Sequence, residues 1–115
     1  MTQIIYKIED ADVWAQAQAK GRYTGSPLDV ADGFVHLSSA DQVRETADKW
    51  FTGREGLVLV QIDADALSST LKWEPSRDGA LFPHNYGDLP MSVVMNVAPM
   101  LLDSKGKHIF APPIA

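Results

Sequence analysis

Short runs of apolar side chains, separated by glycine, proline and acidic residues, predict a chain with several strands and few helices. The run 57–62 is apolar on both faces, which is typical of a strand in the middle of a sheet. Residues 101–103 and 108–110 flank a Ser-Lys-Gly-Lys turn and predict a hairpin. Further strands are predicted at 4–8, 33–38, 71–74 and 91–97, whereas residues 81–87 are predicted to be irregular.

Helical periodicity is strongest just after residues 39–42, where a serine followed by a glutamine three positions later forms a capping box. The helix that follows is expected to bury Val43, Ala47, Trp50 and Phe51. A second, Ala-rich helix follows the acidic residues 9–12 and is stopped by Gly21. Single helical turns are predicted after Ser26-Pro27 and at 63–67.

Together these elements predict an α+β fold, with a bent mixed sheet of about six strands and two or three helices. The 115 residues fit one domain, residues 1–115. Cysteine is absent, which excludes a disulfide scaffold, a thiolate metal site and a cysteine nucleophile. Ten basic and fifteen acidic side chains give a net charge of −5, so we expect no binding to a nucleic acid backbone, which needs a clustered basic face.

The first residues of the chain, 1–7, lack the basic segment and long apolar run of a signal peptide. The longest apolar run, 57–60, is far shorter than the roughly 20 residues of a membrane helix. We therefore expect a cytoplasmic protein that contacts no membrane. The sequence gives no indication of the oligomeric state.

The strongest candidate site residue is His36, which shares a strand face with Phe34 and Ser38. Ser38 precedes a predicted helix, whose free N–H groups can bind an anion. His36 and Ser38 would then face a cleft and hold a polar ligand. The alternative is a core histidine that is satisfied by the backbone, with Ser38 acting only as a helix cap.

Two aromatic segments are further candidates. Trp73-Glu74 places a carboxylate beside a large ring, an arrangement that can shift its pKa or bind a sugar hydroxyl; the alternative is a solvated glutamate on an edge strand. Residues 82–87, with the sequence FPHNYG, could line a site for a planar ligand or cover an apolar edge.

Motifs of the common nucleotide-, metal- and serine-dependent enzymes are missing from the sequence. A metal site of two histidines and one carboxylate can be drawn from His36, His84 and Glu74, but nothing in their spacing requires it, and no metal is expected. The remaining histidine, His108, is expected on the surface.

Several of these segments resemble a known family. The segment 22–38 reads RYTGSPLDVADGFVHLS and is followed by Gln42 and Thr46; Trp73-Glu74 and the sequence FPHNYG come later. On these motifs, which extend over most of the chain, the sequence resembles the small bacterial "domain of unknown function 952" family. Asn85 stands where the family pattern has an apolar residue.

A more distant resemblance is to the ADP-ribosyltransferase superfamily. Residues 34–39 and the helix behind them are similar to its second motif, Glu74 to its acid, and the segment from Phe82 toward residues 93–94 to a late strand. The first-motif position falls on Tyr6 or Lys7, where the superfamily has histidine or arginine.

This resemblance implies an enzyme that cleaves the bond between nicotinamide and ribose in NAD, or acts on another ribose-phosphate compound. Glu74 would stabilise the developing positive charge, His36 would orient the ribose or its phosphate, and Tyr23 or Phe82 would stack on the leaving ring. The implied catalytic pair is His36 and Glu74, and the implied ligand-binding residues are Tyr6, Lys7, Arg22, Tyr23, Ser38, Trp73, Phe82, His84 and Tyr86. The alternative is a non-catalytic module that binds a small ligand or a partner on the same fold.

Overall fold

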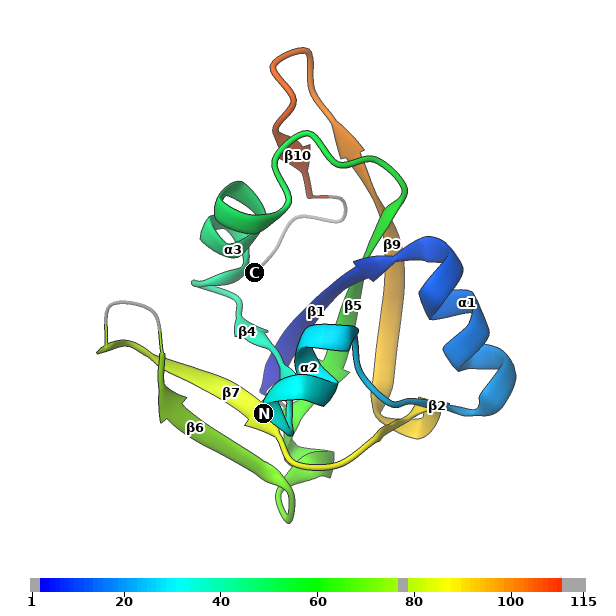
Figure 1. Cartoon of the computed structure of the whole chain (residues 1–115), viewed down its shortest axis with the longest axis vertical. Coiled ribbons are helices and arrows are strands. Elements are labelled where there is room, and N and C mark those ends of the chain that lie inside the picture. The colour runs from blue at the N-terminus through cyan, green and yellow to red at the C-terminus, as the bar shows by residue number, and fades with distance from the viewer. Residues whose placement is uncertain (1–2, 77–78, 111–115) are drawn as a thin grey trace.

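Two strands, β1 (Ile4–Asp10) and β5 (Leu57–Asp63), pair antiparallel along their whole length in the middle of the main sheet (Figure 1). The structure is a computed structural model and describes residues 3–76 and 79–110. The main sheet has the order β10-β9-β5-β1-β4, in which β4 is Ser38–Ser39, β9 is Val94–Leu102 and β10 is His108–Ile109. A register shift opposite Gln61/Ile62 interrupts the pairing of β5 with β9.

Both faces of the central strands are buried, so they separate two apolar clusters. Ile5 and Ile62 belong to the larger cluster, which also takes in Trp14 from the first helix. Tyr6 and Leu59, which come from the same two strands, belong to a second cluster with Val43. This is the arrangement that an apolar run without alternation predicts.

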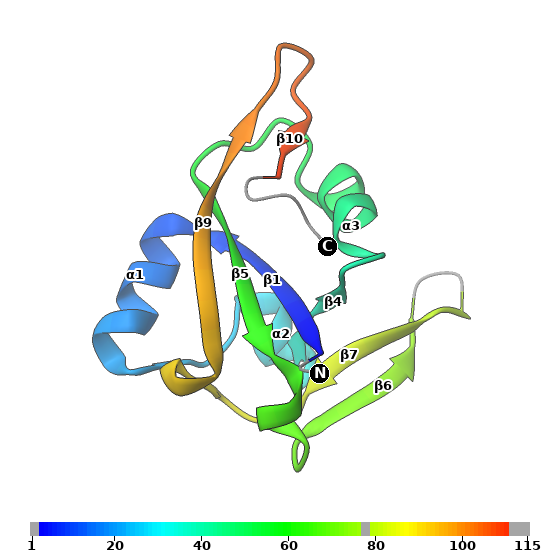
Figure 2. The same ribbon diagram turned by 180° about the vertical axis from the view of Figure 1, so that it is seen from behind.

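The described part of the chain forms three α-helices around the sheet: α1 (Ala11–Lys20), α2 (Pro27–Asp32) and α3 (Val43–Trp50). Gly21 ends α1 in the left-handed conformation, and Ser26 caps α2. The 3₁₀ turn η1 (Ala64–Leu67) follows β5, and the 3₁₀ turn η3 (Met91–Val93) precedes β9. Seen from behind, β9, β5 and β1 cross the middle of the molecule, with α1 at one side (Figure 2).

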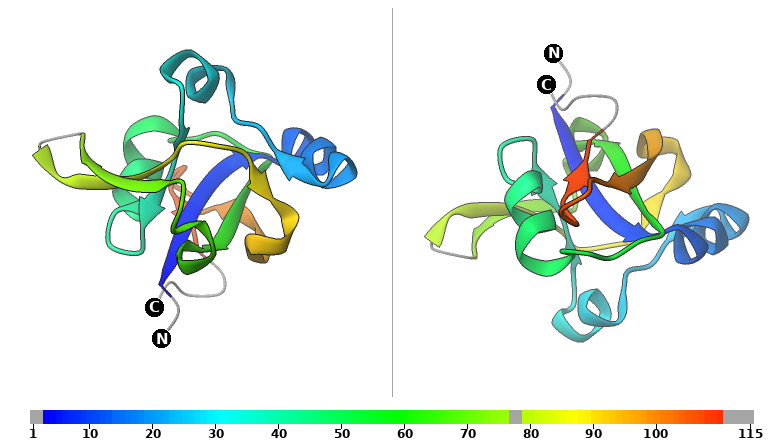
Figure 3. Two further views of the ribbon diagram at one scale, coloured as in Figure 1. Left: turned by 90° about the horizontal axis from the view of Figure 1, so that it is seen from below. Right: turned by 90° about the horizontal axis from the view of Figure 1, so that it is seen from above.

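Two smaller sheets complete the fold. One pairs β2 (Arg22–Tyr23) with β8 (Leu89–Pro90). The other has the order β3-β7-β6, from β3 (Val35–His36), β7 (Leu81–Asn85) and β6 (Leu71–Pro75). Views from below and above show the β6–β7 hairpin projecting on the side opposite α1 (Figure 3).

The α+β class and the small number of helices are confirmed, but the sheet prediction needs correction. The described residues form ten strands in three sheets, and each pairing among them is antiparallel, so the predicted mixed sheet of about six strands is wrong. The predicted strand 33–38 divides at Leu37 and sends its halves to two sheets. An apolar run indicates burial but does not identify the strand that pairs with it. The sequence therefore could not settle the order of the strands or whether they pair parallel or antiparallel.

Other departures have local causes. Residues 81–85 form β7 although they include Pro83, which lies opposite Trp73 of β6 and accepts a hydrogen bond from the Leu37 N–H at 3.1 Å through its carbonyl oxygen. The predicted strand 91–97 begins only at Val94, after the turn η3. His108 is buried and its Nε2 lies 2.9 Å from the carbonyl oxygen of Arg54, so its predicted surface position is also wrong.

Within the part of the chain that the structure describes, no helix has the length and apolar character needed to cross a membrane.

Candidate functional site

A cavity of about 550 Å³ lies between β1, α2, α3 and the end of β7. Its lining combines polar groups with large rings: Lys7, Asp29, His36 and Ser38 on one hand, Trp50 and Phe82 on the other. Pockets of this size and mixed character are the common sites for small molecules.

Asp29 organises the polar wall of the cavity. The carboxylate is buried, with 2% of its surface exposed. It accepts hydrogen bonds from Lys7 Nζ at 2.9 Å, from the Ser26 backbone N–H at 2.9 Å and from the His36 backbone N–H at 3.0 Å. Tyr23 Oη approaches at 3.3 Å. Burial by itself would raise the pKa of Asp29, but the hydrogen bond with His36 and the charge of Lys7 outweigh it and hold that pKa well below its ordinary value.

The local sequence explains the placement of Asp29. Ser26 and Asp29 form a reciprocal capping box at the start of α2, with Asp29 N–H donating to Ser26 Oγ at 3.2 Å. Gly25 has φ +109°, and a Cβ there would lie 2.8 Å from the Cβ of Asp29. A glycine is therefore required for the chain to pass so close to the aspartate.

Lys7 and Glu9 bring opposite charges to the same buried face of β1. Lys7 Nζ also donates to the carbonyl oxygen of His36 at 3.0 Å, so the ammonium joins β1, α2 and β3. Tyr23 Oη donates to Glu9 Oε2, and burial together with this carboxylate raises the pKa of Tyr23 far above its ordinary value. The tyrosine therefore stays a neutral donor in this network.

Both ring nitrogens of His36 face carboxylate oxygens. Nδ1 lies 2.6 Å from Asp29 Oδ1, and Nε2 lies 2.9 Å from Asp32 Oδ2. The two partners differ, because Asp29 is buried whereas Asp32 is 43% exposed at the end of α2. The contact with Asp29 therefore fixes the ring, and the contact with Asp32 is open to exchange with solvent or a ligand.

The β3-β7-β6 sheet connects His36 with Glu74. His36 and His84 are paired across β3 and β7, and their ring centroids are 5.7 Å apart. His84 Nδ1 in turn lies 2.9 Å from Glu74 Oε1 on the next strand. Side chains at these positions share one face of the sheet, and two strand spacings, about 10 Å, separate β3 from β6.

Glu74 is held by two neighbours on that face. Tyr86 Oη donates to Glu74 Oε1 at 2.6 Å, beside the contact from His84. The hydrogen bonds from Tyr86 and His84, in that order of weight, lower the pKa of Glu74. Phe34 stacks on His84 with ring centroids 4.1 Å apart and completes this aromatic cluster.

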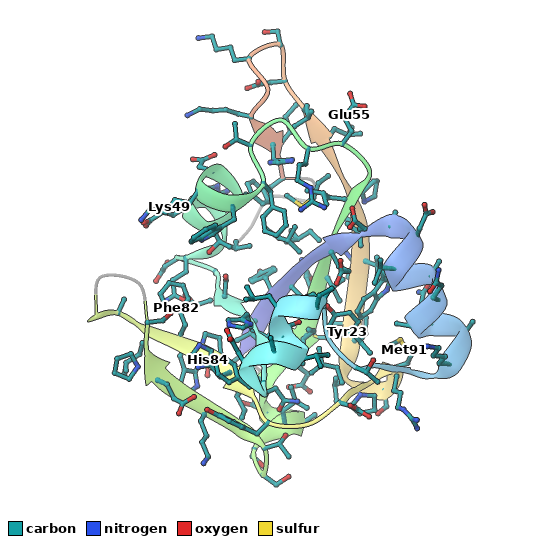
Figure 4. All side chains as sticks on the ribbon, viewed as in Figure 1. Tyr23, Lys49, Glu55, Phe82, His84 and Met91 are labelled. Atoms are coloured by element: carbon teal, nitrogen blue, oxygen red, sulfur yellow. The ribbon has the colours of Figure 1, made fainter. Side chains whose placement is uncertain are left out.

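The structure brings only part of the predicted site together. Tyr6, Lys7, His36, Ser38, Phe82 and His84 line the cavity. Of the residues described, the other five predicted positions, Arg22, Tyr23, Trp73, Glu74 and Tyr86, lie outside its lining. Figure 4 shows Phe82 and His84 on the opposite side of α2 from Tyr23. Arg22 forms an exposed ion pair with Asp88 at 3.4 Å. The binding roles of all these residues stay predictions.

Sequence reasoning missed Asp29, Asp32 and Trp50. The Ser-Pro-Leu-Asp spacing at 26–29 is itself a capping signal and could have drawn attention to Asp29, although not to its burial. Trp50 was expected in the core but is 68% exposed, and it lines the cavity. Among the residues in 3–76 and 79–110, no three histidine and acidic side chains are grouped as a metal site requires.

Comparison with solved structures identifies a relative of the same architecture. The crystal structure of Protein CC0527 from Caulobacter crescentus is 48% identical, with a TM-score of 0.89 over 92% of this chain and 93% of that chain. The solution NMR structure of CC0527 from Caulobacter crescentus is 49% identical, with a TM-score of 0.82 over 90% of each chain. No curated protein matches the sequence. Residues 8–97 match the model of a family described as "Protein of unknown function (DUF952)". The chain therefore belongs to the DUF952 family.

Proposed function

We propose that the cavity binds a small molecule with a planar ring and a polar, ribose-like part, of the class of NAD and other ribose-phosphate compounds. The volume of about 550 Å³ suits a molecule of this size. The rings of Tyr6, Trp50 and Phe82 offer surfaces for a planar group. His36 and Ser38 offer hydrogen bonds at the same cavity.

The observation that carries this proposal is the 2.6 Å contact between His36 Nδ1 and the buried carboxylate of Asp29. A carboxylate on one ring nitrogen sets the orientation of a histidine. The other nitrogen, Nε2, contacts the exposed Asp32 at 2.9 Å, and a ligand that binds there replaces this contact. The Asp29 carboxylate also accepts hydrogen bonds from the Lys7 ammonium and from two backbone N–H groups. Because these donors occupy its oxygens, Asp29 is not available as a nucleophile. His36 is thus the reactive group, and Asp29 is its positioning residue.

A second candidate is an ADP-ribosyltransferase-like reaction on NAD. The contact of His84 with Glu74 favours this reaction, because His84 lines the cavity and connects Glu74 to it. In the hydrolytic form of this reaction, water adds to the anomeric carbon, the bond to nicotinamide breaks, and a base takes the released proton. His36 would take that proton on Nε2, in a complex where the ligand has displaced Asp32 from this nitrogen and the imidazole is neutral. Glu74 would act through His84 rather than by touching the ribose.

A thermal-shift series tests the binding proposal. NAD, ADP-ribose, nicotinamide mononucleotide and AMP are added separately, and a ligand at a hundred times its Kd adds about 2.7 kcal/mol of stability. We expect at least one of them to raise the melting temperature, and His36→Gln to reduce that shift. Lys20→Gln is the control, because Lys20 lies at the end of α1, outside the cavity lining, and is exposed. The proposal fails if none of the four ligands has an effect on the native protein.

The second candidate needs a separate measurement. Nicotinamide release from NAD is followed by chromatography for the native protein and for Glu74→Gln and His36→Gln. Loss of release in both variants, with binding retained in Glu74→Gln, supports the reaction. NAD binding without any release leaves the protein as a binding module.

A further inference from the structure

We propose that Trp50 is the residue that selects the ligand, by stacking on its planar ring at the mouth of the cavity; this inference rests on the proposed function. The ligand class it implies is a molecule with a planar heteroaromatic ring, such as a nucleobase.

The position of Trp50 on α3 is the first step of the argument. At about 100° per residue, Val43, Ala47 and Trp50 fall within one narrow stripe of the helix. Val43 and Ala47 are fully buried in that stripe. Trp50 continues it, yet 68% of its surface is exposed, because the stripe meets the cavity instead of packed side chains at this point.

The opposite helix gives the second step. Leu28 on α2 also lines the cavity and is 62% exposed. Two large apolar side chains from different helices are therefore left uncovered beside one opening. Exposed apolar groups gathered around a pocket are typical of a ligand site, because a ligand covers the surface that water otherwise contacts.

The polar end of the cavity fixes the orientation of such a ligand. Thr46 lies one helical turn before Trp50, and its Oγ1 is 3.1 Å from Ser38 Oγ. One turn of four residues spans about 6 Å along the helix. This separation fits a ring at Trp50 joined to a hydroxyl-bearing sugar near Ser38 and His36, which also line the cavity.

Arg54, four residues after Trp50, also lines the cavity and is already paired. Arg54 donates to both carboxylate oxygens of Asp10, at 3.0 and 3.1 Å, and its guanidinium lies 5.1 Å from the ring centre of Phe51. Stacking, rather than an unpaired cation, is therefore the interaction that this end of the cavity offers. Stacking of a base on an aromatic side chain changes affinity by roughly 5- to 150-fold when the ring is removed.

The test compares AMP binding to the native protein, Trp50→Phe and Trp50→Leu by calorimetry. Trp50→Leu keeps apolar bulk but removes the ring, so we expect affinity to fall about tenfold or more. Trp50→Phe keeps a smaller ring and should recover most of the affinity. Melting temperatures should match in all three proteins, because Trp50 is exposed.

Tryptophan fluorescence separates direct stacking on Trp50 from a purely structural role of this residue, because only stacking makes AMP change its emission. The chain has three tryptophans, Trp14, Trp50 and Trp73. AMP should quench the emission of the native protein and not that of Trp50→Phe. AMP binding of equal strength in Trp50→Leu overturns this inference and leaves the proposed function standing. Failure of the native protein to bind AMP, NAD, ADP-ribose or nicotinamide mononucleotide overturns both.

Discussion

Lys7 Nζ lies 2.9 Å from Asp29 Oδ2, and both side chains are more than nine-tenths buried. This ion pair joins the central strand β1 to α2 beside the cavity. A buried pair contributes little net stability compared with apolar side chains, but removing one partner leaves a charge without compensation. We therefore expect Lys7→Met to lower the free energy of unfolding by about 3 kcal/mol. Urea unfolding measures the change.

A surface lysine is the matched control for this substitution. Lys49 lies 3.7 Å from Glu45 one turn earlier on α3, and both are about half exposed. Lys49→Met should change stability by less than about 1 kcal/mol. Equal effects of the two substitutions would show that the buried pair has no special part in the fold.

Asp29 should make the protein sensitive to acid. Its pKa is lowered in the folded state relative to the ordinary value of 3.8, so the unfolded chain binds a proton at a higher pH than the folded chain does. The stability that follows from this difference is fully present above pH 3.8 and is lost as the pH falls from there toward the folded-state pKa.

The variant Asp29→Asn tests this pH dependence. It should be less stable than the native protein at pH 7, and its stability should fall less steeply below pH 4 because the titrating group is gone. Urea unfolding at several pH values between 2.5 and 7 measures both slopes. Identical slopes in the two proteins would contradict the assignment.

The sequence predicted best those elements whose signals are local. The helical turn after Ser26-Pro27, the glycine stop at Gly21 and the apolar stripe of Val43 and Ala47 each depend on a few neighbouring residues, and each is present in the structure. The capping box predicted at 39–42 is wrong, because the N-cap of α3 is Gln42 and no side chain of the described residues caps the helix. The alternation around His36 also predicted that it shares a face with Phe34, and the two ring centroids lie 4.6 Å apart. Val35 and Leu37 belong to the larger apolar cluster.

The parts that the sequence did not predict depend on residues that meet from distant segments. Trp50 has the spacing of a core residue, and only the arrangement of α2, β1 and β7 leaves open space beneath it. In the sequence Asp29 has the features of an ordinary surface aspartate, and only the folded structure brings Lys7 and His36 into contact with it. The Glu74 contact with His84 arises from the order β3-β7-β6, which no pattern within one strand can reveal.

The hydroxyl of Tyr86 should control the acidity of Glu74. Its hydrogen bond to Glu74 Oε1, at 2.6 Å, is the main cause that lowers the pKa of this carboxyl. Tyr86→Phe removes the donor and keeps the ring, so the pKa of Glu74 should move up toward its ordinary value. NMR titration of the Glu74 side chain measures the shift. An unchanged titration curve would mean that His84 alone accounts for the lowered pKa.

Gly25 and Gly33 lie at the two ends of α2 and allow a matched comparison. Both have positive φ, +109° and +86°, so alanine is strained at either position. Only at Gly25 would the new Cβ also meet another atom, the Cβ of Asp29 at 2.8 Å. No atom lies within 4 Å of a Cβ at Gly33, apart from its chain neighbours and the backbone of its own helix.

Gly33→Ala should therefore lower the free energy of unfolding by about 1 kcal/mol, the cost of a left-handed backbone alone. Gly25→Ala should lower it by more, about 3 kcal/mol, because Asp29 must also move and weaken its contacts with Lys7 and His36. Chemical denaturation measures both values.

The same two variants also test the cavity, because Gly25→Ala should reduce the ligand-induced thermal shift whereas Gly33→Ala should preserve it. Equal losses of stability from the two alanines would mean that Asp29 is not held in place by the close approach of Gly25.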